Sequence, residues 1–462
     1  MRDTGPGLTA SLGAFVAGFQ EAPAAALESA RMGVIDAFGV MLAARNEPVV
    51  SALETVLLGE GGQGSSGAAS VLLSGRRARA IDAAAINATA VHAFAMDDVA
   101  CGCHPSAMLM PALVAQASVQ GAGGAAVLRA WVAGFEILAE LAAREPDALH
   151  SSGWHPSGML GPVAVAGAVA NLMGLSAEAA TRALGIAASM TGGLFVNFGT
   201  QTKPLHAGRI ASAGLLAAQL ARQGVTSAPD ALERESGLLR TVSPRKRVDL
   251  AGGHGASAGV DAPLRILSTG LSIKKYPVCY SLHRVADAAI DVGRMAGFDP
   301  DAVDRVEVTL GKTQAWMADK HDPATPNEAK YCIEYVVAAG LVARAAGFAQ
   351  LTPEFMQDAR LRRLLPLVRV TLRDDVSADD PVFCVADQVV AHLRDGSSFD
   401  SGAVPYARGH ARLPLAEADL RAKFLDCVAA SGWGDGARLY ERLRGFERLD
   451  RVDDLERAGR AG

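Results

Sequence analysis

The sequence predicts an α+β protein that consists of a large all-helical domain and a smaller α/β lid domain. Half of the 462 residues are hydrophobic but only 5% are aromatic. Ala, Leu and Val must therefore build the core, which favours closely packed helices. Residues 107–239 have helical patterns almost throughout, whereas strand-like alternation begins after about residue 270. A chain of this length commonly forms two domains.

The N-terminal part is expected to begin with helices. Residues 8–45 contain two amphipathic helical patterns, and a further helix is predicted over residues 78–96. Between them, the glycine-rich stretch 59–67 is expected to be a flexible loop. It lacks the Gly-Lys-Ser/Thr ending of a phosphate-binding loop, so no nucleotide is expected there.

The second part alternates between strands and helices. The period-two patterns that predict strands lie at 306–310, 368–372 and 389–393. Helical patterns accompany them at 281–296, 328–346 and 353–365. This alternation predicts the α/β lid domain over residues 270–402. Residues 415–460 return to a charged amphipathic helical pattern.

Charge and cysteine content argue against several classes of function. The net charge of −5 and the lack of a basic run speak against a nucleic-acid partner. Gly, Pro or charged residues interrupt every apolar stretch before about 20 residues, so no membrane span is predicted. Residues 1–6 are polar, and no signal peptide is expected. Six cysteines in so long a chain fit the reduced thiols of a cytoplasmic protein.

The most informative stretch is Thr202-Lys-Pro-Leu-His-Ala-Gly-Arg209, which precedes a helix-forming run over residues 210–220. A lysine just before a helix start places an ammonium beside unpaired backbone N–H groups. That combination suits a small carboxylate. Taken alone, Lys203 could equally be a solvated loop lysine, with Pro204 only starting the helix.

A similar arrangement occurs twice more. His104-Pro-Ser and His155-Pro-Ser each precede a helical run of small residues, with Ser106 or Ser157 available as the helix cap. Two histidines and a lysine at helix starts suit a polyanionic substrate that undergoes proton transfer.

These segments resemble the MmgE/PrpD family, which includes 2-methylcitrate dehydratases and cis-aconitate decarboxylases. The matching stretches follow the family's order at 92–111, 153–172, 202–232, 274–290 and 329–339. The string from Lys203 to Arg209 is the most specific of them. The resemblance implies that the C-terminal tail rejoins the helical domain, which would then comprise 1–269 and 403–462. It also implies an active site in the cleft between the two domains.

The resemblance places the family's acidic motif on residues 92–98. Asp97 and Asp98 match its last two acids and His92 its opening histidine. Ala95 stands where the family commonly has its first aspartate. Asp97 is therefore expected to act in catalysis and Asp98 to bind substrate, although adjacent carboxylates in a loop could also simply be solvated.

The lid domain would supply the other side of the site. Lys274 takes the lysine of the family's Lys-x-Tyr/Phe-Pro motif and is expected to bind a carboxylate. Cys279 stands where cis-aconitate decarboxylases have histidine and many other members have cysteine; it could be a small buried apolar residue or a functional thiol. His283 and Tyr335 would close over the substrate, although Tyr335 could equally be a core tyrosine.

The expected site divides by role. The expected catalytic residues are His104, His155, Lys203, Asp97 and Tyr335. The expected substrate-binding residues are Lys274, His283, Cys279, Asp98 and His206. No metal and no organic cofactor are expected, because Cys101-Gly-Cys103 has no second cysteine pair at zinc spacing. The expected partner is a small di- or tricarboxylate substrate, and a homodimer is expected.

The predicted reaction begins with removal of a proton α to a carboxylate of that substrate, with cations and helix N-termini stabilising the developing charge. Dehydration of a 2-methylcitrate-like acid is preferred, because the resemblance makes it the commonest activity. Epimerisation, decarboxylation and a catalytically silent protein that binds an acid or serves as a scaffold remain alternatives. A metal-dependent hydrolase that uses Asp97, Asp98 and the nearby histidines is a weaker one, because the resemblance implies no metal. Ala95 and Cys279 predict little decarboxylation of cis-aconitate, since neither provides the aspartate or imidazole expected there.

Overall fold

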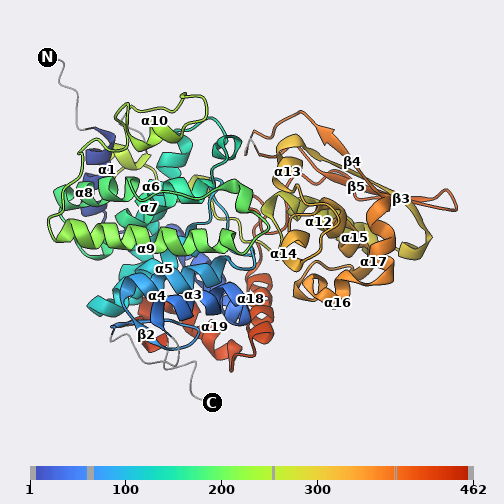
Figure 1. The fold of residues 1–462 in the computed structure, drawn as a ribbon, viewed down its shortest axis with the longest axis horizontal. Coiled ribbons are helices and arrows are strands. Elements are labelled where there is room, and N and C mark those ends of the chain that lie inside the picture. The colour runs from blue at the N-terminus through green and yellow to red at the C-terminus, as the bar shows by residue number, and fades with distance from the viewer. Residues whose placement is uncertain (1–6, 60–66, 252–254, 379, 381, 456–462) are drawn as a thin grey trace.

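The computed structural model describes residues 7–59, 67–251, 255–378, 380 and 382–455. Figure 1 shows a helical body and a smaller lid lying side by side along the long axis. Most of the predicted loop at 59–67 lies outside the described residues. The architecture is α+β, as the sequence predicts.

The helical body contains helices from both ends of the chain. Its N-terminal helices are α1 (Leu8–Gly18), α2 (Ala24–Ala43), α3 (Pro48–Leu58), α4 (Ala80–His92), α5 (Pro105–Gln120), α6 (Gly124–Ala143), α7 (Pro156–Leu172), α8 (Ala177–Ala188), α9 (Thr202–Arg222), α10 (Leu238–Val242) and α11 (Arg265–Thr269). The C-terminal helices α18 (Glu417–Ser431) and α19 (Gly436–Arg444) pack against α2. A short antiparallel pair, β1 (Ala69–Ser70) and β2 (Arg77–Ala78), lies beside α4.

Small residues let the helices of the body approach closely. A Cβ atom on Gly208 of α9 would lie 2.3 Å from Thr89 Oγ1 and 2.6 Å from the Ala85 carbonyl oxygen, both on α4. A Cβ atom on Gly134 of α6 would lie 2.7 Å from Ala168 Cβ on α7. The core of the body therefore depends on the alanine- and glycine-rich composition.

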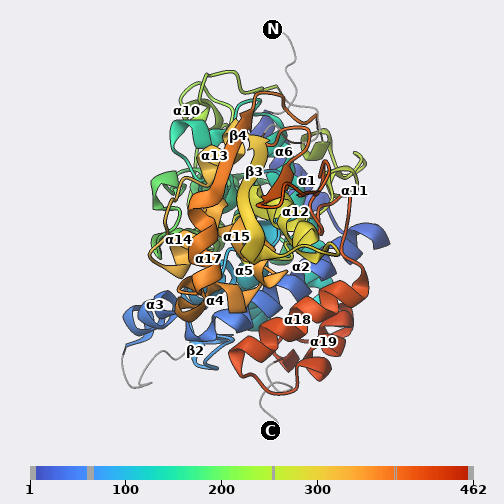
Figure 2. The same cartoon turned by 90° about the vertical axis from the view of Figure 1, so that its right-hand side faces the viewer.

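The lid contains the larger of the two sheets. Its elements are α12 (His283–Arg294), β3 (Val303–Gly311), α13 (Lys312–Met317), α14 (Pro326–Ala329), α15 (Ile333–Ala343), α16 (Pro353–Met356), α17 (Ala359–Leu364), β4 (Val368–Arg373), β5 (Gln388–Leu393) and β6 (Ser398–Asp400). The strand order is β4-β3-β5-β6, with β3 parallel to β4 and the other pairs antiparallel. Figure 2 shows β3 and β4 in front of α12 and α15, on the side of the lid away from the body.

The apolar side chains form two main cores. One contains residues of the N-terminal helices together with Leu420, Phe424 and Tyr440 of the tail. The other contains lid residues from Tyr276 onward, and Phe195 and Phe198 of the body join it. The Phe195 ring stacks on Trp316 with 4.4 Å between centroids. The loop before α9 thus joins the body to the lid.

Several sequence predictions can be compared with these elements. The three predicted strands lie within β3, β4 and β5, which confirms them. The predicted helix at 353–365 is divided, because Asp358 accepts hydrogen bonds from the backbone of Arg360 and Leu361 and starts α17 anew. The predicted start of α9 was too late, because the helix begins at Thr202. Helix α4 ends at His92, before the predicted residue 96. In the described part of the chain, no helix is both long and apolar enough to cross a membrane.

Candidate active site

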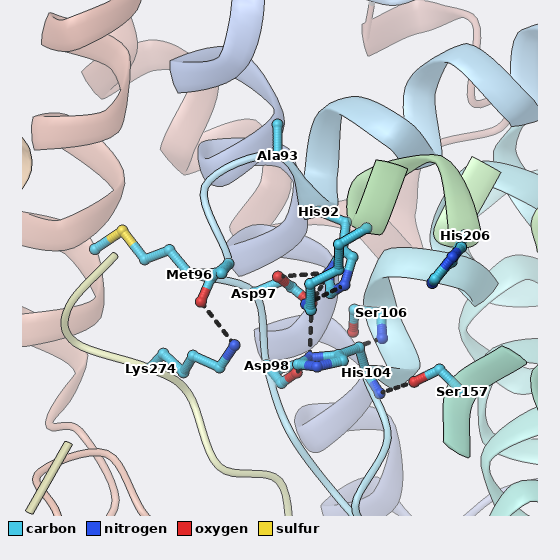
Figure 3. A network of polar contacts seen from close by, with 12 residues as sticks. His92, Ala93, Met96, Asp97, Asp98, His104, Ser106, Ser157, His206 and Lys274 are labelled. Carbon is cyan, nitrogen blue, oxygen red and sulfur yellow. Dashed lines mark hydrogen bonds and ion pairs between the residues drawn. The ribbon is translucent and has the colours of Figure 1, made fainter. Parts of the chain in front are cut away.

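The candidate site is built around the buried carboxylate of Asp97, in the turn between α4 and α5. Both carboxylate oxygens lie 3.0 Å from Nδ1 of His92, the last residue of α4. Oδ2 also lies 2.9 Å from Nδ1 of His104, which directly precedes α5. Figure 3 shows the two imidazoles converging on this carboxylate. One buried acid therefore orients two histidines from opposite ends of the turn.

The groups that face the Nδ1 atoms decide the tautomers of both rings: Asp97 faces both, and the Asp98 backbone carbonyl also lies 3.0 Å from Nδ1 of His104. Burial alone would raise the pKa of Asp97, but His92, His104 and Lys274 outweigh it and hold that pKa well below its ordinary value. An ionised carboxylate can only accept hydrogen bonds. Both imidazoles must therefore present Nδ1–H to Asp97, which leaves each Nε2 as an acceptor.

Lys203, at the first turn of α9, extends the network. Its Nζ lies 2.7 Å from Nε2 of His92, so the chain of contacts runs from Asp97 through His92 to Lys203. The side chain is buried, and its ammonium lies 4.9 Å from the centre of the Phe198 ring. Burial, followed by repulsion from Lys274, lowers the pKa of Lys203 to about 7. Lys203 is therefore a buried, titratable residue and not a solvated loop lysine.

His155, directly before α7, supplies a third imidazole. Its Nδ1 lies 3.1 Å from Nδ1 of His206 on α9, and its Nε2 has no hydrogen-bond partner among the described residues. Burial, then the nearby Lys203, holds the pKa of His155 well below its ordinary value. Gly193 makes room for this pair: its φ is +146°, and a Cβ atom there would lie 3.3 Å from His206 Nδ1.

The serines after the two histidines do not cap their own helices as predicted. Asp98 does this for α5, since its Oδ1 accepts a hydrogen bond from the Ser106 backbone N–H at 3.0 Å. Ser157 of α7 instead accepts from the His104 backbone N–H at 3.2 Å. The starts of α5 and α7 are thereby linked directly, which holds His104 and His155 near each other, with ring centroids 6.0 Å apart.

A cavity adjoins this network between the body and the lid. Its wall includes His104, His155 and Lys203 from the body, and Lys274, Cys279 and Tyr331 from the segment that leads into the lid and from the lid itself. This cavity has a volume of about 50 Å³, and it adjoins a second cavity of about 500 Å³, with Val99, His150 and Tyr280 lining both. The catalytic candidates thus face a small cavity that lies beside a larger one.

Lys274 brings a second cation to this cavity. The side chain is buried, and its Nζ donates a hydrogen bond to the Ala95 carbonyl at 2.7 Å. Burial lowers the pKa of Lys274, and Asp97 opposes that effect. Two lysines and three imidazoles around one cavity, with one ionised acid behind them, suit an anionic ligand.

The structure places the other predicted residues behind the cavity wall. Tyr335 donates its hydroxyl hydrogen to the Gln350 carbonyl at 2.5 Å, inside the lid. His283 is enclosed between Tyr276 and Tyr280, and burial lowers its pKa to about 3. His206 and Asp98 also lie outside the described cavity wall, where they support His155 and α5. These four were predicted to touch the substrate, and the geometry gives them supporting positions.

Four residues at the site had no predicted role. His92 links Asp97 to Lys203, and the sequence indicated it only as the opening histidine of the family's acidic motif. Tyr331 and Phe198 line the cavity, and His150 lies where the two cavities meet. An isolated aromatic residue in a loop gives no sequence signal of this kind.

Three ring nitrogens could in principle hold a metal ion. One nitrogen each from His92, His104 and His155 lies within 4.8 Å of the others. However, the Asp97 carboxylate and the Lys203 ammonium already occupy both nitrogens of His92. A cation bound there would have to displace the ammonium, so the contacts fit an anion better than a metal.

Comparisons with known proteins agree with this architecture. The MmgE/PrpD N-terminal domain matches residues 10–251, and the MmgE/PrpD C-terminal domain matches residues 276–438. The chain is 28% identical to a cis-aconitate decarboxylase of Mus musculus over 74% of this chain and 70% of that protein. It is 28% identical to one of Homo sapiens over 80% and 77%, and 26% identical to one of Aspergillus terreus over 72% and 71%. The two domain matches together span most of the sequence, and the chain therefore belongs to the MmgE/PrpD family.

Proposed function

We propose that this protein is a lyase that removes a proton α to a carboxylate of a small di- or tricarboxylic acid and then eliminates water, as a 2-methylcitrate dehydratase would. The observation that carries the proposal is the Asp97 carboxylate shared between His92 and His104, with Lys203 on the far nitrogen of His92. This arrangement provides a base and an acid at one cavity, and elimination of water needs both.

His104 is the proposed base. Burial lowers its pKa to about 4, although Asp97 works in the opposite direction, so the ring is neutral at pH 7. Its Nδ1–H faces Asp97 and its Nε2 remains able to accept a proton. The Asp97 carboxylate then stabilises the imidazolium that forms.

Lys203 is the proposed acid, and Lys274 the main carboxylate ligand. As His104 takes the α-proton, the electrons of that C–H bond form the new double bond. The C–O bond at the neighbouring carbon breaks, and a proton from the Lys203 ammonium lets the oxygen leave as water. The positive charge of Lys274 stabilises the carboxylate beside the developing carbanion.

Decarboxylation of cis-aconitate is the second candidate, because the relatives bear that name. Two positions argue against it. The resemblance expects an aspartate at Ala95 and the imidazole of a decarboxylase at Cys279. Ala95 instead offers a backbone carbonyl to Lys274, and the Cys279 thiol accepts a hydrogen bond from Ser281 at 3.2 Å.

A ligand screen tests the proposal. Purified protein is incubated with a panel of di- and tricarboxylates, and a rise in melting temperature identifies those that bind. A ligand at a hundred times its Kd stabilises the folded state by about 2.7 kcal/mol. Each hit is then followed by NMR in D2O, where deuterium entry at the α-carbon or a new olefinic signal is expected. A panel of binders without either change would favour the silent acid-binding alternative.

The homodimeric state and the cytoplasmic location remain predictions. All six cysteines are free thiols, five of them buried, which fits a reducing compartment. Light scattering after size-exclusion chromatography measures the oligomeric state directly, and a mass near twice 47.7 kDa is expected.

A further inference from the structure

Three buried lysines converge on the turn that carries Asp97. The Nζ atom of Lys330 donates to the Ala93 carbonyl at 3.2 Å, that of Lys274 to the Ala95 carbonyl at 2.7 Å, and that of Lys423 to the Met96 carbonyl at 2.8 Å. Figure 3 shows the turn with Lys274 reaching it from the side opposite His206. Each of three carbonyls in a four-residue turn therefore accepts a charged donor.

The three lysines come from separate parts of the chain. Lys274 lies in the segment that leads into the lid, Lys330 lies between α14 and α15 of the lid, and Lys423 lies on α18 of the tail. All three are at least 95% buried. The turn is thus tied at once to the lid and to the C-terminal helices.

The backbone of the turn explains why external donors are needed. Helix α4 ends at His92, and Ala95 adopts a left-handed conformation with φ +53°. Because the helix does not continue, the carbonyls of residues 93, 95 and 96 lack the N–H partners that a further helical turn would supply. Buried carbonyls without a partner are costly, and here the lysines satisfy them.

Apolar contacts support the same link. The Phe94 ring packs edge-on against Phe348 of the lid, with 5.1 Å between centroids, and the Lys330 ammonium lies 4.9 Å from the Phe94 ring centre. Met96 belongs to a small core with Cys427 of α18. The turn therefore contacts both the lid and the C-terminal helices, through apolar as well as polar groups.

We propose that Lys330 and Lys423 are positioning residues that hold the 93–96 turn so that Asp97 keeps both imidazoles in their Nδ1–H form. This rests on the proposed function, because the orientation of His104 by Asp97 matters only if His104 acts as the base. Neither lysine lines the described cavity wall, so their effect on the reaction passes through the turn. Lys274 differs, since it also faces the cavity.

Burying an ammonium group costs free energy, and that cost is high for a contact that is only structural. Burial lowers the pKa of Lys330 to about 8 although Glu47 attracts the ammonium, and its described contacts besides the Ala93 carbonyl are the neutral Asn327 side chain and the Phe94 ring. Lys423 has an ion-pair partner in the buried Asp36. A role in holding the Asp97 carboxylate in position against the two imidazoles accounts for three such groups on one turn better than packing alone.

The test uses two variants and a matched control in the full-length chain. Lys330→Met removes one tie and keeps the apolar stem. Lys423→Met is combined with Asp36→Asn, so that no unpaired buried carboxylate remains to unfold the protein. The control is Lys312→Met, since Lys312 lies on α13 of the same lid, is 60% exposed and pairs with the exposed Asp374.

Two readouts are measured on the folded variants. With an accepted substrate, we expect kcat to fall roughly tenfold or more while KM changes little, because Lys203 and Lys274 remain in place. Without substrate, NMR of ¹⁵N-labelled histidine should show His92 and His104 in the Nδ1–H form in the parent protein. That preference should be lost in both variants and kept in Lys312→Met.

The two readouts separate this proposal from the proposed function. The histidine signals do not depend on which acid is the substrate, so a loss of the Nδ1–H form supports the positioning role even if dehydration is never observed. Unchanged histidine tautomers in Lys330→Met and in the double variant would overturn the proposal, whether or not kcat falls. So would a kcat equal to that of the parent protein.

Discussion

At the scale of single residues, the site depends on one buried carboxylate that serves two histidines. Asp97 remains ionised because cationic and imidazole neighbours offset the cost of burying it. Burial lowers the pKa values of Lys203 and Lys274, and no carboxylate of the described residues forms an ion pair with either ammonium. The free site therefore holds excess positive charge that a polycarboxylate would neutralise on binding.

Lys203→Ala should abolish turnover while the protein stays folded. The lysine supplies the proposed proton and its side chain faces the cavity, so kcat/KM should fall by much more than tenfold, or about 1.4 kcal/mol. Steady-state kinetics and a melting curve measure the two effects. Lys312→Met serves as the control, and retention of more than roughly a tenth of kcat/KM would show that Lys203 is peripheral.

The pH dependence of kcat/KM should follow Lys203 on its alkaline side. Its pKa is lowered to about 7, and only the ammonium form can donate a proton or attract a carboxylate. Activity should therefore decline as pH rises through about 7. His104, with a pKa lowered to about 4, must be neutral, so activity should also fall only below about pH 4. A rate that keeps increasing to pH 9 would mean that Lys203 acts as a neutral base.

Removal of metal ions should leave activity unchanged. His92, His104 and His155 could offer three nitrogens, but the Lys203 ammonium already lies 2.7 Å from one of them. Dialysis against a chelator followed by an activity assay measures this. Full loss of activity, restored by one particular metal, would contradict the proposed roles of these residues.

At the scale of elements, the site requires α4 and α9 to pack closely. His92 lies at the end of α4 and Lys203 at the start of α9, so the spacing of the two helices sets the 2.7 Å contact. Gly208 permits that spacing, since any Cβ atom there would collide with α4. Helix packing and proton transfer are thus coupled by a residue outside the cavity.

Gly208→Ala should reduce both stability and activity. The added methyl group must push α4 and α9 apart, which costs about 1–3 kcal/mol in an overpacked core and lengthens the contact between His92 and Lys203. Denaturant unfolding and kcat/KM are measured together. Gly434→Ala is the matched control, because nothing lies within 4 Å of a Cβ atom at that exposed position. Wild-type values for Gly208→Ala would show that the helix contact is adaptable.

Much of the element pattern could be predicted from the sequence, and the exceptions have physical causes. The strands β3 and β5 follow alternation that reflects one buried face, which is a local signal, whereas β4 alternates in sequence but buries only Val368. The end of α4 could not be predicted in this way, because alanine favours helix and the left-handed Ala95 is held by lysines distant in sequence. Asp358 divides the predicted helix at 353–365. It is a local helix-start signal, but the spacing of apolar residues alone does not reveal it.

At the scale of the whole molecule, the site forms where two cores meet. The body provides Asp97, His104, His155 and Lys203, and the lid side provides Tyr331 and Cys279. The motifs predicted most of these residues but not which tyrosine faces the cavity. Tyr331 precedes α15, whereas Tyr335 lies in its first turn and donates to the Gln350 carbonyl within the lid. Orientation of this kind depends on how the lid packs, which spacing in the sequence does not reveal.

The most direct measurement compares two substrates under identical conditions. The purified protein is incubated separately with 2-methylcitrate and with cis-aconitate, and products are followed by NMR, with Lys203→Ala as the inactive control. We expect olefinic signals of a dehydrated product from 2-methylcitrate or a close homologue, and no itaconate. Itaconate formed from cis-aconitate at ordinary enzymatic rates, without dehydration of any hydroxy acid tested, would contradict the proposed reaction and the interpretation of Ala95 and Cys279.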